Sequence, residues 1–256
     1  MFGALVLVVL NHSYALWRSV SRRSFWVTRL AAAAALAASF GLPAIASAGL
    51  CGDDVAGVRV ACSCGDFVVS DTMLVATDPV VTDRCPTDGL VVQAAEGTDS
   101  LTLDLGGLSI TGSGVGVGLL VSNGGSDGAV ISGGPDSIRP GQVVGFGDGL
   151  RVRTQRALSE LANVDFRGNT GDGVAIRSYE TKVTAVRAFA NGRDGIRISG
   201  RKATLDTLES DGNGRFQLNM ETSSAAQAAL DGAITQGVHA RERLPNRREP
   251  VPMGEQ

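Results

Sequence analysis

The segment that decides the fold reads Asn191-Gly192-Arg193-Asp194-Gly195-Ile196-Arg197-Ile198, and three other segments can be laid over its last six residues. They are residues 147–152, 171–176 and 213–218. The first apolar residues of the four copies are Leu150, Val174, Ile196 and Phe216, which gives successive periods of 24, 22 and 20. Apolar and polar residues alternate in each copy, as in a strand with one buried face. These four residues, and the apolar residue two positions after each, are therefore predicted to point inward.

A second strand is expected between the copies, at residues 162–166, 183–188 and 203–208. Each of these strands runs into a turn that contains Asn169, Asn191-Gly192 or Asp211-Gly212. Asn and Asp tolerate left-handed backbone and Gly adopts it freely, so the chain is predicted to corner at these residues.

A period of this length, with two or three short strands in it, indicates coils that stack so that each strand pairs with its equivalent one coil on. A leucine-rich repeat would need its own Leu and Asn pattern, and a propeller blade about twice the length. The sequence therefore predicts an all-β fold, a right-handed parallel β-helix of about seven turns over residues 88–236. Apolar strands near Leu90, Leu101, Leu119 and Ala129 are expected to belong to it.

Residues 1–48 are predicted to be a signal region. An Ala-rich apolar stretch follows Arg29 and ends in the cleavage motif Ala46-Ser47-Ala48. The pair Arg22-Arg23 resembles a twin-arginine export signal, with general secretion as the alternative. A further apolar run at residues 1–10 indicates that the true translation start lies downstream, near Val20. At the other end, residues 237–256 are rich in Arg and Pro, and they are predicted to be a disordered tail.

Four cysteines lie close together in the sequence, at Cys51, Cys62, Cys64 and Cys85. In an exported chain an even number indicates two disulfides, for which three connectivities exist. Cys51–Cys62 with Cys64–Cys85 is favoured, because Cys62 and Cys64 would then staple successive layers. A metal site at Cys62 and Cys64 is the rival interpretation, but it lacks His partners and the usual C-x-x-C spacing. Residues 49–87 are thus predicted to form a disulfide-bonded N-terminal cap.

The charge of the chain is unevenly distributed. Residues 1–48 hold four Arg and no acidic side chain, so the remainder has 19 basic and 26 acidic side chains. That surplus of acid argues against nucleic acid as a partner, since phosphate binding requires a surplus of Lys and Arg. Once the signal region is cleaved, no membrane span is expected.

The order of motifs after the second cysteine pair resembles the bacterial right-handed parallel β-helix proteins of the pectin-lyase-like superfamily. Cys64-Gly65-Asp66 leads to Cys85-Pro86, then to residues 88–92 and to the T-L-D-L-x-G-x-x-I-x-G pattern at residues 102–112. The resemblance covers residues 64–236. It implies an exported, carbohydrate-associated bacterial protein, secreted, periplasmic or at the cell surface. It does not imply one activity, because relatives include sugar lyases, hydrolases and epimerases.

Candidate site residues come from the repeat itself. Asp148, Asp172 and Asp194 occupy equivalent positions, so they are expected to stack at about 4.8 Å as a possible Ca²⁺ site. The arginines of the same repeat are expected to point outward and grip the carboxylates of an acidic sugar chain, with Arg197 as a candidate catalytic base; they are Arg151, Arg153, Arg177 and Arg197. The plainer interpretation is that Asp-Gly builds a turn and the arginines neutralise the Asp row.

Two functions follow from these alternatives. The first is a non-catalytic binding or structural module, outside the cell or at its surface, associated with carbohydrate. The second is a polysaccharide lyase or related enzyme that acts on acidic glycans with Ca²⁺. The only histidine after the predicted cleavage site is His239, in the predicted tail, so a catalytic triad is not expected within the repeats.

Overall fold

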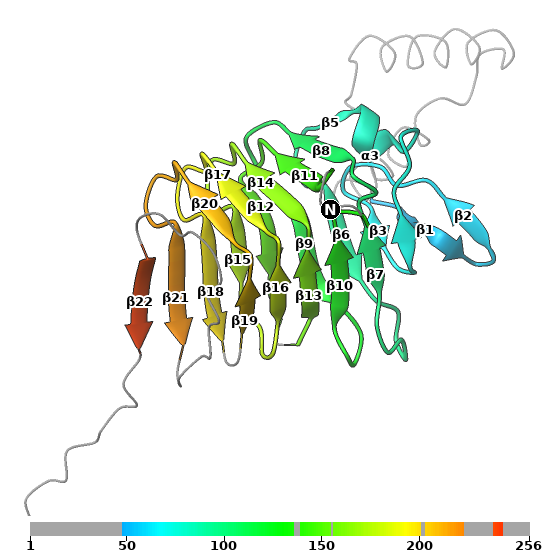
Figure 1. Cartoon of the computed structure of the whole chain (residues 1–256). Coiled ribbons are helices and arrows are strands. Elements are labelled where there is room, and N and C mark those ends of the chain that lie inside the picture. The colour runs from blue at the N-terminus through cyan, green and yellow to red at the C-terminus, as the bar shows by residue number, and fades with distance from the viewer. Residues whose placement is uncertain (1–47, 136–138, 155, 201–202, 223–237, 243–256) are drawn as a thin grey trace, which may run out of the picture. The chain divides into compact units, whose positions relative to one another are not determined.

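The computed structural model describes residues 48–135, 139–154, 156–200, 203–222 and 238–242. The predicted signal region, apart from Ala48, and most of the predicted tail lie outside these residues. In the described part the fold is all-β, with three largely parallel sheets and one short helix, α3 (Pro79–Thr82) (Figure 1). No helix in these ranges is long and apolar enough to span a membrane.

Sheet 1 has ten strands, and sheets 2 and 3 have six each, counted over the described residues. Sheet 1 runs in the order β2 (Val58–Val60), β1 (Leu50–Val55), β3 (Phe67–Val68), β6 (Leu90–Gln93), β9 (Val117–Asn123), β12 (Asp148–Val152), β15 (Val174–Ile176), β18 (Ile196–Gly200), β21 (Leu218–Thr222) and β22 (Val238–Glu242). Sheet 2 consists of β4 (Thr72–Met73), β7 (Thr102–Asp104), β10 (Ala129–Ser132), β13 (Leu158–Ala162), β16 (Lys182–Thr184) and β19 (Thr204–Asp206). Sheet 3 consists of β5 (Arg84–Cys85), β8 (Ser109–Gly112), β11 (Gly141–Val144), β14 (Val164–Arg167), β17 (Arg187–Phe189) and β20 (Glu209–Asp211).

From β3 to β21 the chain visits sheets 1, 2 and 3 in strict rotation, and each strand pairs in parallel with the strand three elements on. All neighbouring strands in sheet 1 are parallel except β1 and β2, which are antiparallel. The predicted all-β fold and pairing between successive coils are therefore present.

The registers correct the predicted repeat at its last copy. Leu150 pairs with Val174 and Val174 with Ile196, as predicted, but Ile196 pairs with Leu218 rather than with Phe216. Leu218 is buried, whereas Phe216 is only half-buried. The prediction that Phe216 points inward was wrong, because alternation alone cannot distinguish a register from one shifted by two positions.

The predicted second strand is in fact two strands in different sheets. Asn163, Ala185 and Thr207 have positive φ values of 57°, 51° and 53°, and each separates a strand of sheet 2 from one of sheet 3. A single left-handed residue turns the chain between the sheets, which a short apolar run does not reveal.

Of the corners that lead back to sheet 1, the one at Gly212 lies within the predicted Asp211-Gly212 turn, whereas the other two lie one residue before the predicted asparagines. The left-handed residues are Gly168, Ala190 and Gly212. The asparagine that follows each, Asn169, Asn191 and Asn213, does not make the corner but directs its side chain inward. Asn191 donates from Nδ2 to Asn213 Oδ1 at 2.9 Å, and Asn169 Nδ2 donates to Asn191 Oδ1 at 2.9 Å. These three residues form an asparagine ladder, in which Asn169 and Asn191 are 1% and 2% exposed.

Aliphatic side chains from all three sheets fill one continuous core. Leu90, Leu119 and Leu150 stack in sheet 1 and are fully buried, as are Phe146 and Phe166. Burial of such side chains stabilises each by roughly 1.5–3 kcal/mol relative to exposure, so the stacked apolar columns hold the coils together.

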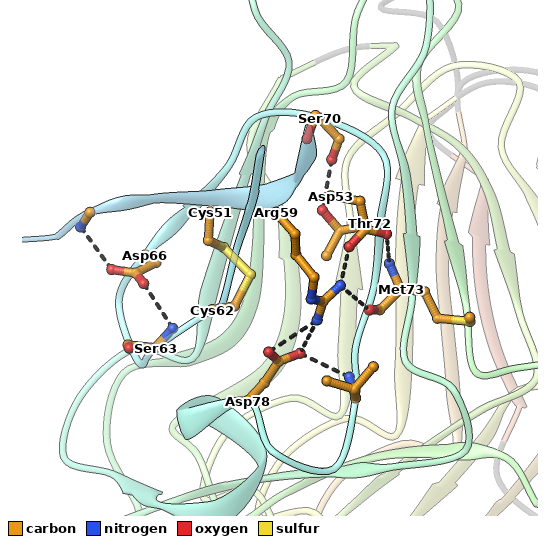
Figure 2. The surroundings of a disulfide bond; sticks show 12 residues. Cys51, Asp53, Arg59, Cys62, Ser63, Asp66, Ser70, Thr72, Met73 and Asp78 are labelled. Atoms are coloured by element: carbon orange, nitrogen blue, oxygen red, sulfur yellow. Dashed lines mark hydrogen bonds and ion pairs between the residues drawn. A yellow bond between two sulfur atoms is a disulfide. The ribbon is translucent and has the colours of Figure 1, made fainter. Parts of the chain in front are cut away.

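The N-terminal region belongs to the same stack. β3, β4 and β5 pair with β6, β7 and β8, so stacking begins at Phe67 rather than at the predicted residue 88. Two disulfides join Cys51 to Cys62 and Cys64 to Cys85, the connectivity favoured from the sequence. The first closes the hairpin β1–β2 (Figure 2).

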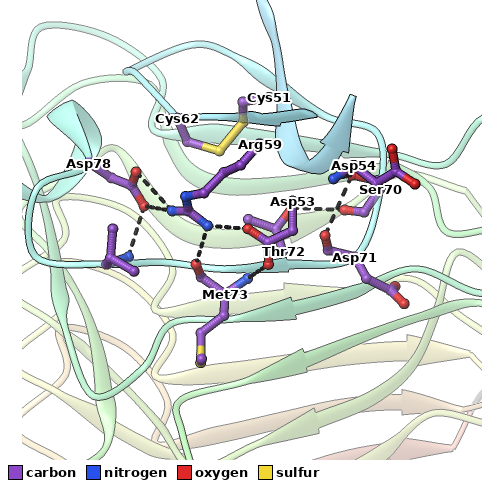
Figure 3. Close-up of polar contacts among 11 residues, drawn as sticks. Cys51, Asp53, Asp54, Arg59, Cys62, Ser70, Asp71, Thr72, Met73 and Asp78 are labelled. Atoms are coloured by element: carbon purple, nitrogen blue, oxygen red, sulfur yellow. Dashed lines mark hydrogen bonds and ion pairs between the residues drawn. A yellow bond between two sulfur atoms is a disulfide. The ribbon is translucent and has the colours of Figure 1, made fainter. Parts of the chain in front are cut away.

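Arg59 clamps this hairpin to the start of the stack. Its Nη2 donates to both carboxylate oxygens of Asp78, at 3.1 and 2.9 Å, and its Nη1 donates to the Met73 carbonyl at 3.2 Å and to Asp53. Asp53 in turn accepts the Met73 backbone N–H (Figure 3). Asp78 is 1% exposed, so the guanidinium compensates a buried charge.

At the other end, β22 pairs with β21 along its whole length. Residues 238–242 were predicted to lie in a disordered tail and instead form a strand. The stretch between the two strands lies outside the described residues.

Candidate functional site

The three aspartates predicted to form a row do so. Asp148, Asp172 and Asp194 each lie two positions before the paired residues Leu150, Val174 and Ile196. Asp148 Oδ1 accepts the Asp172 backbone N–H at 2.9 Å, and Asp172 Oδ1 accepts the Asp194 backbone N–H at 3.2 Å. The three residues are only 6%, 2% and 0% exposed, so this aspartate column is part of the framework between coils.

Arginines and one amide occupy the outer side of the aspartate column. Arg151 donates to Asp148 through Nε at 2.9 Å and through Nη2. Arg197 Nη1 lies 3.5 Å from Asp172 Oδ2. Asn219 Nδ2 donates to Asp194 Oδ2 at 2.7 Å. These contacts are the neutralisation that the plainer interpretation of the Asp-Gly repeat predicts.

Burial raises the pKa of the Asp172 carboxyl. The hydrogen bond from the Asp194 backbone N–H and the charge of Arg193 oppose this rise, and the neighbouring carboxylates Asp148 and Asp194 add to it. Asp172 therefore carries the cost of a buried charge between two others of the same sign.

A fourth aspartate, Asp88, lies in line with the column but is separated from Asp148 by one valine, and in the other direction the column ends at Asp194. Asp88 accepts the Val117 backbone N–H through Oδ1 at 2.7 Å, and Val117 pairs with Asp148. Phe216 takes the equivalent position after Asp194, because Ile196 pairs with Leu218. Asp88 was not among the predicted site residues, although the motif Asp-Gly followed by an apolar residue recurs at residues 88–90.

No group of three or more His, Cys, Asp or Glu side chains is arranged to hold a metal ion among the residues that the structure describes. Most oxygens of the aspartate column already face backbone N–H groups or cationic and amide side chains, whereas Asp194 Oδ1 accepts no hydrogen bond and has Arg215 Nε 3.7 Å away. A Ca²⁺ ion would have to displace these partners.

A shallow groove of about 390 Å³ lies beside the aspartate column. Gly116, Gly147 and Gly171 stack along the groove. Gly116 and Gly147 precede the paired residues Val117 and Asp148, and Gly171 precedes Asp172, which bonds to Asp148. The lining of the groove consists of Asp88, Gly116, Val117, Gly147, Asp148, Arg151, Arg153, Thr170 and Gly171. Polar backbone and side-chain groups dominate this lining, so the groove suits a hydrophilic ligand.

Two of the four arginines that were predicted to bind a ligand have side chains that are available to bind one. Arg153 and Arg177 directly follow β12 and β15 and are exposed, and neither side chain makes a hydrogen bond or ion pair with the described residues. Arg153 also lines the groove. Arg151 and Arg197 are instead paired with Asp148 and Asp172. Arg197, the predicted base, is thus held by a carboxylate.

Comparison of the chain with family models, with curated proteins and with solved structures finds no match to any of them.

Proposed function

We propose that this protein is an exported, right-handed parallel β-helix of the pectin-lyase-like kind that binds acidic polysaccharide without cleaving it. The strict rotation through three parallel sheets supports the coil architecture. Two disulfides in a short N-terminal stretch support export, because such bonds persist in oxidising compartments.

The observation that carries the binding proposal is a pair of arginines without partners among the described residues, Arg153 and Arg177, of which Arg153 lines the groove. Arg153 and Arg177 stand at equivalent positions of neighbouring strands, about 4.8 Å apart along the sheet. Guanidinium groups bind carboxylate and sulfate in bidentate geometry, and two of them in a row match a chain with repeated acidic groups. The glycine-lined groove gives a sugar ring room to approach the backbone.

The absence of cleavage is proposed from the state of the candidate catalytic groups. The aspartate column is buried and occupied, and Arg197 is paired with Asp172. The lyase alternative would need these ion pairs to open before Ca²⁺ or a base became available, so the arrangement supports it less well.

The test is a calorimetric titration, in which polygalacturonate, a sulfated glycan and a neutral glycan are each added to the protein and the heat of binding is measured. We expect binding of the acidic chains only. The double variant R153A/R177A should weaken it at least about tenfold, which is the loss of roughly 1.4 kcal/mol. The control is K182A, which removes one exposed positive charge from sheet 2, where Lys182 pairs with Glu160.

Equal binding by the double variant and the unaltered protein would contradict the proposed site. The same samples are assayed for unsaturated sugar product with and without Ca²⁺. Ca²⁺-dependent product that disappears in R197A would favour the lyase alternative instead.

A further inference from the structure

Six aspartates of the described chain are almost fully buried, and five of them have an arginine as a counter-charge. These five are Asp78 with Arg59, Asp148 with Arg151, Asp165 with Arg167 and Arg187, Asp172 with Arg193 and Arg197, and Asp194 with Arg215. The sixth is Asp66, which is 8% exposed and forms no ion pair with a lysine, arginine or histidine of the described residues. A carboxylate withdrawn from water normally needs such a partner.

The Asp66 carboxylate is held by two backbone N–H groups instead. Its Oδ1 accepts the N–H of Gly49 at 2.7 Å, and its Oδ2 accepts the N–H of Ser63 at 2.8 Å (Figure 2). Both donors are neutral amides, so they provide hydrogen bonds to the carboxylate but no positive charge.

The N-terminal region has no spare cationic side chain for Asp66. Residues 49–138 contain only two basic side chains, Arg59 and Arg84. Arg59 is paired with Asp78, and Arg84 Nε donates to a backbone carbonyl at 2.8 Å. The counter-charge of Asp66 must therefore come from another kind of group.

Gly49 is fixed beside Asp66 by the start of the stack. Its carbonyl oxygen accepts the Phe67 N–H at 2.8 Å, and the next residue, Leu50, begins β1 and pairs with Phe67. Cys51, two positions after Gly49, is held by its disulfide. A Cβ at residue 49 would lie 3.2 Å from Asp66 Oδ1, so the absence of a side chain lets the carboxylate approach the Gly49 nitrogen closely.

Gly49 is also the residue that follows the predicted cleavage motif, which ends at Ala48. Hydrolysis of the Ala48–Gly49 peptide bond consumes one water, leaves a carboxylate on Ala48 and gives Gly49 a free amine. That amine takes up a proton, because α-amino groups are mostly protonated at pH 7. Cleavage thus converts a neutral donor of Asp66 into a cation.

We propose that the mature chain begins at Gly49 and that its N-terminal ammonium forms the missing ion pair with Asp66. Charge-assisted hydrogen bonds are stronger than neutral ones, so this pair gives the cleaved chain stability that the uncleaved chain lacks. Processing is thereby coupled to the attachment of β1 to the stack. The inference rests on the predicted cleavage site and is independent of the proposed glycan binding.

The first test is N-terminal sequencing of protein purified in the form in which the producing cell accumulates it. We expect Gly49 as the first residue. Any other first residue, or a chain that retains residues 1–48, overturns the inference.

The second test measures whether the N-terminal charge and Asp66 are coupled. A variant with two glycines inserted between Ala48 and Gly49 keeps the cleavage motif, but its ammonium is displaced by up to about 7.6 Å and Gly49 again supplies a neutral N–H. Asp66→Asn is introduced into the unaltered and the extended protein, and urea unfolding gives the equilibrium constant of each. Asp66→Asn should raise the unfolding constant about tenfold more in the protein that begins at Gly49 than in the extended protein.

Asp83→Asn is the matched control, because Asp83 is exposed and its carboxylate accepts a hydrogen bond from the exposed Thr82 hydroxyl at 3.2 Å. It should have the same effect in both backgrounds. If Asp66→Asn yields no folded protein, the two proteins with Asp66 intact are compared, and the extension alone should raise the unfolding constant about tenfold. Equal stability of these two, or equal effects of Asp66→Asn in both backgrounds, overturns the ion pair and leaves Asp66 as a cap for two backbone N–H groups.

Discussion

The first and last coils of the stack differ in length and in the contacts that join each coil to the next. Along the outward column of sheet 1, the sequence spacing is 24 from Phe67 to Val91, then 29 to Leu120 and 31 to Arg151. From Arg151 the spacing is 24 to Ala175, and then 22 to Arg197 and 22 again to Asn219. The early spacings range from 24 to 31 residues, whereas the later ones lie between 24 and 20, the last being 20 from Asn219 to His239.

The contacts that hold the coils together differ accordingly. The early coils have two disulfides and the Arg59 clamp. The late coils have the asparagine ladder and the aspartate column, in which each residue bonds its own counterpart one coil on. The asparagine ladder joins coils of equal length, since 22 residues separate Asn169 from Asn191 and Asn191 from Asn213. The aspartate column tolerates spacings of 24 and 22 residues.

The largest expected effect tests the ladder. Asn191→Ala removes an amide that donates to Phe166 O and Asn213 Oδ1 and accepts from Asn169. Several buried polar groups would then lack partners, so the free energy of unfolding should fall by about 3–5 kcal/mol. The measurement is urea unfolding followed by circular dichroism. Asn123→Ala is the control, at an exposed asparagine that donates a long bond of 3.4 Å to Ala94 O and accepts the exposed Gly125 N–H at 3.2 Å, and it should cost less than about 1 kcal/mol. Similar losses for the two variants would show that the ladder is not what stabilises the late coils.

An intermediate effect is expected at the clamp of the early coils. Arg59→Met leaves Asp78 buried without its counter-charge, although the Val75 backbone N–H still donates to it. Because Arg59 itself is 37% exposed, the expected loss is about 2 kcal/mol rather than that of a fully buried pair. Urea unfolding measures it. Arg177→Met, at an exposed arginine, should change stability by less than about 0.5 kcal/mol, and a clamp variant as stable as this control would refute the role of Arg59.

The smallest effect is expected within the aspartate column. Asp172 has a pKa raised by burial, so the folded protein binds its proton more tightly than the unfolded chain does. Its contribution to stability is then greatest below the unfolded pKa and falls as the pH rises through the higher folded pKa. Asp172→Asn removes this pH-dependent loss of stability, because the amide does not ionise, and it keeps an oxygen that can accept the Asp194 N–H. We expect the variant to be within about 1 kcal/mol of the unaltered protein at pH 7, or more stable.

The difference between the two unfolding curves should change across the acidic range in which Asp172 titrates. Stability of the unaltered protein that rises relative to the variant as the pH increases would contradict the raised pKa.

The repeat, and hence the all-β fold with its paired coils, could be predicted from residue types and their spacing alone. The copies at Leu150, Val174 and Ile196 alternate clearly between apolar and polar residues, because one face of each strand is buried and that face requires apolar side chains. The repeat likewise placed the aspartate row, because equal spacing puts like residues on neighbouring strands.

The last register, most of the corners and the partners of each charged side chain depend on the folded stack and could not be predicted. Leu218 rather than Phe216 follows Ile196, at the spacing of 22 residues that also separates Asn191 from Asn213 in the asparagine ladder. The left-handed corners at Ala185, Ala190 and Thr207 use residues that carry no preference for that conformation. Whether an arginine is free, like Arg153, or engaged, like Arg197, depends on which carboxylate its neighbouring coil brings within reach, and that distance is a property of the folded stack.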